Sequence, residues 1–160
     1  MVCLSICIPT YNYGAFIGQA LNSILSQLSP QVEVIVLDGG STDNTEAVVC
    51  AMQSTCDSLT YFRQDFRGGI DRDIETVVAM AKGEYCWLFS ADDVMKQGAI
   101  DQVLQAIQSK DDVYICEHIL CDINMSPVNA YPPFNKLKQA QTFDLSDESQ
   151  RRNYFRLART

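Results

Sequence analysis

Histidine, clustered cysteines and long apolar runs are the features that this sequence of 160 residues has least of. It contains one histidine, His118, and none of its seven cysteines lies in a Cys-x-x-Cys pair. Because a zinc ion needs several Cys or His ligands at close spacing, these counts argue against a zinc site. The number of cysteines is odd, and several lie in apolar, strand-like runs, where we expect reduced, buried thiols: Cys3, Cys7, Cys86 and Cys116.

The marks of a membrane-spanning or secreted protein are also missing. No run reaches the roughly 20 apolar residues that cross a bilayer, and no charged segment precedes an apolar one at the start of the sequence. We therefore expect a cytoplasmic protein.

Basic residues are few. The sequence has 12 Lys and Arg against 20 Asp and Glu, a formal net charge of −8. This balance argues against a nucleic-acid partner, since binding a polyanion needs clustered cations. Segment 9–14 contains no Lys or Arg, which disfavours a nucleotidyltransferase with a basic phosphate loop. No Gly-x-Gly-x-x-Gly opens the first predicted helix, which disfavours a dinucleotide-binding oxidoreductase.

Apolar runs and helical patterns alternate along most of the chain. We expect strands at 3–8, 32–37, 59–62, 85–89 and 112–116, with helices between them. We expect Pro9 to end the first strand, because proline cannot donate to a sheet ladder, and Gly83 to end the third helix at its C′ position. The order predicts an α/β fold, a three-layer sandwich with a mostly parallel central sheet covered on both faces.

Two adjacent acids follow the predicted strand at 85–89. This strand, which we expect to be buried, leads directly to Ser90, Ala91, Asp92 and Asp93. Ligands of open α/β sheets bind outside the carboxyl ends of the strands, and paired carboxylates are held together by a hard divalent cation. Alternatively, Asp92 or Asp93 caps the helix that we expect to begin near Lys96.

Several polar segments follow the strands, and together they indicate a family. They are Ile-Pro-Thr-Tyr-Asn at 8–12, Asp-Gly-Gly-Ser-Thr-Asp-Asn-Thr at 38–45, the Gly-Gly loop at 68–69 with Arg72, and Gly-Glu-Tyr before Ser-Ala-Asp-Asp at 90–93. This combination closely resembles the nucleotide-sugar-binding domain of inverting family 2 glycosyltransferases with the GT-A fold, over about residues 3–116. The amino-acid sequence at 68–73 and 87–95 is most similar to that of the abequosyltransferase-type branch, which builds bacterial O-antigen.

The resemblance implies a nucleoside pocket at the first two loops. Pro9, Thr10 and Tyr11 would line the nucleobase, with the Tyr11 ring as a stacking surface; alternatively, Tyr11 is a half-buried aromatic at a strand end. Asp38 would accept a hydrogen bond from the base, or it serves only to form the turn. Arg72 would reach the base or a phosphate through its planar guanidinium, or it pairs with a neighbouring aspartate, Asp71 or Asp73.

The resemblance also implies a metal and phosphate site. Asp92 would hold Mg²⁺ or Mn²⁺ against the two phosphates, beside Ser90 and Ala91, and Asp93 would support the metal or cap the next helix. The chain departs from the family pattern at two positions. Gly39 stands where many members have a second acid, and Ser90 stands where the Asp-x-Asp motif has its first.

We expect the nucleotide-sugar-binding domain to span 1–121, and 122–160 to be an irregular segment plus a helix that begins an acceptor region. The chain thus looks truncated and catalytically incomplete. No catalytic base matches the family, since Glu117, His118 and Asp122 fit no motif. The implied activity is transfer of a sugar from a nucleotide-sugar donor to a glycan or lipid-linked acceptor. The alternative is a non-catalytic nucleotide-sugar-binding module.

The last stretch, Ser146 to Thr160, predicts a helix with a capping signal at Ser146 and several arginines. A solvated helix with cations at its C-terminal end explains this pattern. The alternative is peripheral contact with the inner membrane, which its mixture of basic and aromatic residues favours.

Overall fold

The computed structural model describes residues 1–116, 118–122, 124–128 and 141–158. The chain divides into two compact units, Met1–Asp111 and Asp112–Thr160. The first unit holds the whole sheet and is described first. Glu117 and most of the segment expected to be irregular, at 129–140, lie outside the described residues.

A parallel sheet forms the centre of the first unit. Its strands are β1 (Leu4–Thr10), β2 (Val32–Asp38), β3 (Leu59–Arg63) and β4 (Tyr85–Leu88), in the spatial order β3-β2-β1-β4. Every pair is parallel. The carboxyl ends of all these strands therefore lie at one edge of the sheet, which brings the loops after them to the same edge.

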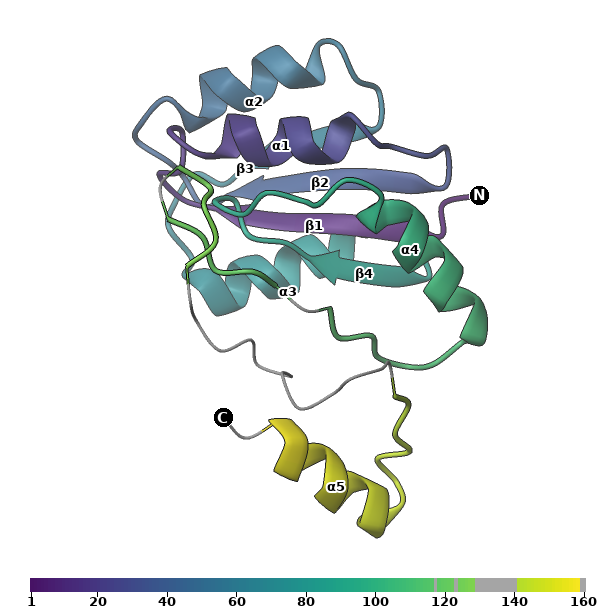
Figure 1. Ribbon diagram of the computed structural model, residues 1–160. Coiled ribbons are helices and arrows are strands. Elements are labelled where there is room, and N and C mark those ends of the chain that lie inside the picture. The colour runs from purple at the N-terminus through teal and green to yellow at the C-terminus, as the bar shows by residue number, and fades with distance from the viewer. Residues whose placement is uncertain (117, 123, 129–140, 159–160) are drawn as a thin grey trace. The chain divides into compact units, whose positions relative to one another are not determined.

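Helices cover both faces of this sheet (Figure 1). They are α1 (Ile17–Leu25), α2 (Thr45–Gln53), α3 (Ile70–Met80) and α4 (Ala99–Ala106), which continues into the 3₁₀ turn η1 (Ile107–Ser109). The larger core joins one sheet face to α1, α2 and α4, and the smaller core joins the other face to α3 through Val77. The predicted three-layer α/β architecture is confirmed.

Pro9 lies within β1, so the expectation that it ends the strand is wrong. The carbonyl of Cys7 accepts a hydrogen bond from the N–H of Phe89, just after β4, at 3.0 Å. Backbone polar groups alternate sides along a strand, so Pro9, two residues on, also faces the β4 side. Pairing with β4 ends at Cys7, whereas pairing with β2 continues to Thr10. Because Pro9 has no N–H to donate, the ladder with β4 ends before it, whereas the ladder with β2 is unaffected.

β4 is an edge strand and is not buried on both faces. Tyr85 and Trp87 pack against the larger core, but Cys86 is exposed and Leu88 is 48% exposed. A continuous apolar run predicts burial on both faces, yet the second face of a strand is buried only where another element covers it. Of the cysteines in apolar runs, Cys7 is fully buried, and burial raises the pKa of its thiol to about 12, whereas Cys116 is exposed like Cys86.

The expected strand at 112–116 is absent from the structure, where these residues form no regular element. Val113 and Ile115 are 71% and 52% exposed. Alternating apolar residues suit a half-buried strand, but a strand exists only where its backbone is paired with another.

The second unit contains one described helix, α5 (Glu148–Ala158). The carboxylate of Asp147 accepts a hydrogen bond from the N–H of Gln150 at 2.8 Å, so Asp147 caps the helix. Ser146, the expected cap, instead donates its hydroxyl to Asp144 at 2.6 Å. The cap lies one residue later than predicted, because aspartate and serine both suit this position. The end of the expected helix, at 159–160, lies outside the described residues.

Candidate nucleotide-sugar site

The loops after β1 and β2 are hydrogen-bonded into one framework. The N–H of Asn12 donates to the Ser41 hydroxyl at 2.8 Å, and the Asn12 side-chain oxygen accepts from the N–H of Thr42 at 2.7 Å. Asn12 has a φ of 59°, in the left-handed region that asparagine tolerates better than most residues. The N–H of Gly39 also donates to the Thr10 carbonyl at 2.9 Å. The two loops thus hold one another in place.

Asp43 extends this framework to the start of α2. Its carboxylate accepts hydrogen bonds from the N–H groups of Gly14 and Thr45 at 2.9 and 3.0 Å. The hydrogen bond from the Thr45 hydroxyl is the main reason that the pKa of Asp43 lies below its ordinary value. Asp43 therefore orders the turn before α2, whose N-cap residue is Asn44.

Asp38 is fully buried at the end of β2, and its two oxygens serve two structural bonds. One oxygen accepts from the N–H of Ser41 at 2.7 Å, and the other accepts from the hydroxyl of Tyr61 at 2.6 Å. Burial, together with this bond to Asp38, raises the pKa of Tyr61 well above its usual range, so its hydroxyl stays a donor. This geometry favours the turn-forming role of Asp38, since both of its carboxylate oxygens already accept hydrogen bonds within the protein.

Thr10 and Tyr11 close the end of β1. Thr10 is 5% exposed, and its hydroxyl oxygen is the one buried side-chain polar atom without a hydrogen-bond partner in the described part of the chain. Such groups are rare in folded proteins and often mark a place where a ligand binds. The ring of Tyr11 is half-buried, with the guanidinium carbon of Arg67 4.3 Å from its centre. Arg67 thus lies on the ring that we expected to stack on a base.

Arg72 is exposed, and its guanidinium carbon lies 5.0 Å from the ring centre of Phe66. The ion pairs found among the described residues do not include the expected alternative, a pair between Arg72 and Asp71 or Asp73. The guanidinium therefore keeps its hydrogen-bond donors for solvent or a ligand.

Ser90 and Asp92 are neighbours after β4, and the Ser90 hydroxyl donates to the Asp92 carboxylate. Both are exposed, whereas Ala91 between them is 2% exposed and anchors the loop in the larger core. Helix α4 begins at Ala99 after an N-cap at Gly98, so neither Asp92 nor Asp93 caps it. The capping alternative is therefore wrong. The expected start near Lys96 was too early, because residues 93–98 form turns and irregular structure.

The oxygen atoms in the loop after β4 suit a hard cation that takes most of its ligands from phosphates and water. Asp92 offers exposed carboxylate oxygen, with the Ser90 hydroxyl bound to it and Asp93 next in the chain. Over the described ranges, no group of three or more His, Cys, Asp or Glu residues is placed to hold a metal. Mg²⁺ and Mn²⁺ bind in this way, through one or two carboxylates with phosphates and water completing the shell.

Sequence reasoning missed some residues of this edge, Tyr61 and Arg67 among them. Tyr61 belongs to β3 and reads as an ordinary strand aromatic, and only the fold shows that it reaches Asp38. Arg67 could have been found, because an arginine directly before a Gly-Gly pair lies in a loop after a strand.

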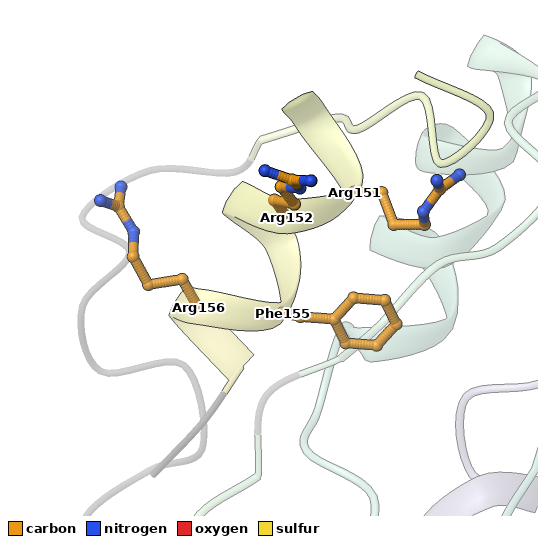
Figure 2. A pocket seen from close by; sticks show the side chains of 4 residues that line it. All are labelled: Arg151, Arg152, Phe155 and Arg156. Carbon is orange, nitrogen blue, oxygen red and sulfur yellow. The ribbon is translucent and has the colours of Figure 1, made fainter. Parts of the chain in front are cut away.

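A separate hollow of about 430 Å³ belongs to the second unit (Figure 2). It is lined by Arg151, Arg152, Phe155 and Arg156, all from α5. Arg152 pairs with Glu148, and Arg151 donates to the Leu145 carbonyl at 2.7 Å. None of the predicted nucleotide or metal residues lines this hollow.

A parallel sheet that carries interlocked polar loops at the carboxyl ends of its strands defines an open α/β protein, a class whose ligands bind at those strand ends. The sequence matches the model of Glycosyl transferase family 2 over residues 5–155. The chain belongs to glycosyltransferase family 2, and the resemblance seen in the motifs is confirmed.

Individual relatives agree with this assignment. The abequosyltransferase RfbV of Salmonella typhimurium is 32% identical over 71% of this chain and 35% of its own length. The glycosyltransferase GlyG of Streptococcus pneumoniae is 32% identical over 68% of this chain and 36% of its own. The chain thus spans about a third of the length of these relatives.

Solved structures share the fold. S. aureus TarS in complex with UDP-GlcNAc superposes with a TM-score of 0.63 at 26% identity, covering 68% of this chain and 32% of that one. The mannosyltransferase PcManGT from Pyrobaculum calidifontis, in complex with GDP-Man and Mn²⁺, gives 0.61 at 27% identity, covering 65% and 32%. Among the described helices, none has the length and apolar character needed to cross a bilayer.

Proposed function

We propose that this chain is the donor-binding part of an inverting, metal-dependent glycosyltransferase. It would transfer a sugar from a nucleotide-sugar to a glycan or lipid-linked acceptor in bacterial cell-surface polysaccharide synthesis, as in O-antigen. The observation that carries the proposal is the set of strand-end loops at one sheet edge, with the unpartnered Thr10 hydroxyl after β1 and the exposed Asp92 carboxylate after β4. The names of the relatives support it, since they include an abequosyltransferase and proteins solved with UDP-GlcNAc or GDP-Man.

The nucleoside part is assigned to the loop after β1. Pro9, Thr10 and Tyr11 line the base, and the Thr10 hydroxyl finds in the ligand the partner that it lacks among the described residues. Arg67 moves off the Tyr11 ring or stacks with the base upon it. Asp38 does not contact the ligand in this assignment. It is a positioning residue that holds the turn after β2 by accepting a hydrogen bond from the N–H of Ser41.

The diphosphate is assigned to the loop after β4 and to Arg72. Asp92, with Asp93 beside it, holds Mg²⁺ or Mn²⁺, and Ser90 orients the Asp92 carboxylate through its hydrogen bond. When bound, the cation neutralises the negative charge that develops on the nucleoside diphosphate leaving group. Ala91 keeps the loop seated on the core while its polar neighbours face the ligand.

Calorimetric titration of the chain with UDP, CDP, GDP and dTDP, each in Mn²⁺ and in EDTA, tests this proposal. We expect one nucleotide to bind, at least about tenfold more tightly in Mn²⁺ than in EDTA, a difference of about 1.4 kcal/mol. That result would also identify the carrier. Absence of binding to all four nucleotides would contradict the proposal, with a circular dichroism spectrum of the same sample showing that the protein is folded.

We also propose a cytoplasmic location with peripheral contact to the inner membrane, through α5. Support comes from its exposed arginines and from Phe155, which is 52% exposed. Because arginines near an anionic surface contribute about 1 kcal/mol each, we expect sedimentation with phosphatidylglycerol vesicles but not with phosphatidylcholine vesicles. Binding should fall when Arg151 and Arg156 are changed to Gln. Equal sedimentation with both vesicle types would contradict the proposal.

A further inference from the structure

Asp73 is a buried acid that the assignments above leave unused. It lies near the start of α3 and is 4% exposed. One carboxylate oxygen, Oδ1, accepts a hydrogen bond from the side-chain amide of Gln64, just after β3, at 2.8 Å. The ion pairs of the described residues do not include Asp73. A carboxylate held out of water by one neutral donor is costly unless a further donor reaches it.

The carboxylate of Asp73 lies between two glycines from different loops. A Cβ atom built on Gly39, after β2, would stand 2.8 Å from Asp73 Oδ2, and one built on Gly68, after β3, would stand 3.2 Å from Oδ1. The glycines with positive φ are 40, 69 and 98, so the backbone of Gly39 does not itself require glycine. A side chain at position 39 would therefore have to displace the Asp73 carboxylate.

At position 39 the loop after β2 carries no side chain. Here the carboxylate reaches the same space from α3. Thr10 borders that space too, since its carbonyl oxygen lies 3.6 Å from the Cβ position of Gly39 and its buried hydroxyl has no partner among the described residues. The buried carboxylate of Asp73 and the carbonyl of Thr10 thus both border the space beside Gly39, and the unsatisfied Thr10 hydroxyl belongs to the same residue as that carbonyl.

We propose that Asp73 binds the nucleoside part of the donor, its carboxylate accepting a hydrogen bond from a base N–H or a ribose hydroxyl. Gly39 and Asp73 then form a complementary pair, in which the acid comes from α3 and the glycine makes room for it. This inference rests on the proposed function, because it assumes a nucleotide-sugar at this edge. It assigns to Asp73 the acceptor role that Asp38 is less able to take, because both Asp38 oxygens are already hydrogen-bonded to Ser41 and Tyr61.

The close fit of Gly39 and Asp73 can be tested without a ligand. Gly39→Asp should lower the thermal unfolding temperature, because its side chain meets the Asp73 carboxylate at close range and with like charge. In the double variant Gly39→Asp, Asp73→Ala, much of that loss should be recovered. If the effects of the two substitutions simply add, the two side chains do not share one space, and the inference is overturned.

Binding tests the role of the carboxylate. Asp73→Asn keeps the size and the Gln64 contact, and it should weaken binding of the best of UDP, CDP, GDP and dTDP by about 10- to 100-fold, as expected for a hydrogen bond to a charged group. Asp71→Asn, an exposed acid on the same helix, is the matched control and should bind like the wild type. The double variant with Asp at 39 should bind more tightly than Asp73→Ala alone.

A comparison of nucleotides with and without ribose hydroxyls distinguishes the two possible hydrogen-bond donors to Asp73. If Asp73→Asn costs less affinity for the 2′,3′-dideoxy form of that nucleotide than for the ribose form, the partner is a ribose hydroxyl; an equal cost indicates the base. Wild-type affinity in Asp73→Asn, with the wild type binding normally, overturns this inference and leaves the proposed function standing. A wild type that binds no nucleotide overturns both.

Discussion

Replacing Asp92 with alanine is expected to abolish the metal-dependent part of nucleotide binding and to leave the fold intact. The carboxylate is exposed at the end of β4 and contacts Ser90 and not the core, so its loss removes no packing. Removing residues that only orient metal ligands costs about 10- to 100-fold in affinity, so losing a ligand should cost about 100-fold or more. In calorimetry, affinities in Mn²⁺ and in EDTA should become equal.

The control for this experiment is Asp57→Ala. Asp57 is also an exposed acid, but it precedes β3 and so lies at the opposite edge of the parallel sheet. This variant changes the net charge by the same amount and should keep the ratio of affinities in Mn²⁺ and EDTA. If Asp92→Ala binds as tightly in Mn²⁺ as the wild type does, the metal assignment is wrong.

The architecture could be predicted from sequence because each element carries its own local signal. The β-branched run at 32–37 is apolar throughout, as a strand with both faces covered must be, and it is β2 in the structure. The outermost part of the sheet, at β4 and beyond it, was harder to predict from the sequence. Burial of Cys86 and pairing of 112–116 depend on what lies beside them, and no local pattern encodes a neighbour.

The loops of the site were predictable, but the roles of their residues were not. Asp38 and Asp92 both follow strands, and a sequence treats them alike, yet one is fully buried between two donors and the other is exposed. Asp73 is four residues beyond a glycine pair, with no motif to distinguish it. Its importance arises from the distance to Gly39, which chain folding alone sets.

Replacing Gly83 is the second change for which we expect a large effect, here on stability. The sequence pointed to this glycine, but the role that we inferred for it was wrong. We expected Gly83 to be the C′ residue of α3, but α3 ends at Met80, its C-cap residue Ala81 is already extended, and Gly83 is not among the glycines with positive φ. Instead it lies against β1. A Cβ atom at Gly83 would stand 2.8 Å from the backbone nitrogen of Ser5, and backbone cannot move aside as a side chain can.

A buried polar network depends on this close approach. The N–H of Gly83 donates to the Ser5 hydroxyl at 2.9 Å, and that hydroxyl donates to Glu33 at 2.7 Å. Glu33 also accepts from the N–H of Lys82 at 2.7 Å. Pushing Gly83 outwards would therefore break hydrogen bonds of buried groups as well as displace the start of β4.

Gly83→Ala should lower the free energy of unfolding by about 3 kcal/mol, the upper range for overpacking. In a domain of this size that corresponds to a drop of about 6–12 °C in the thermal unfolding midpoint. Gly18→Ala is the matched control, because its Cβ would meet a movable side-chain atom of Val48 at 3.3 Å and alanine favours the helix. Asparagine separates the two explanations: a C′ position tolerates it, whereas close approach to β1 makes Gly83→Asn at least as destabilising as Gly83→Ala.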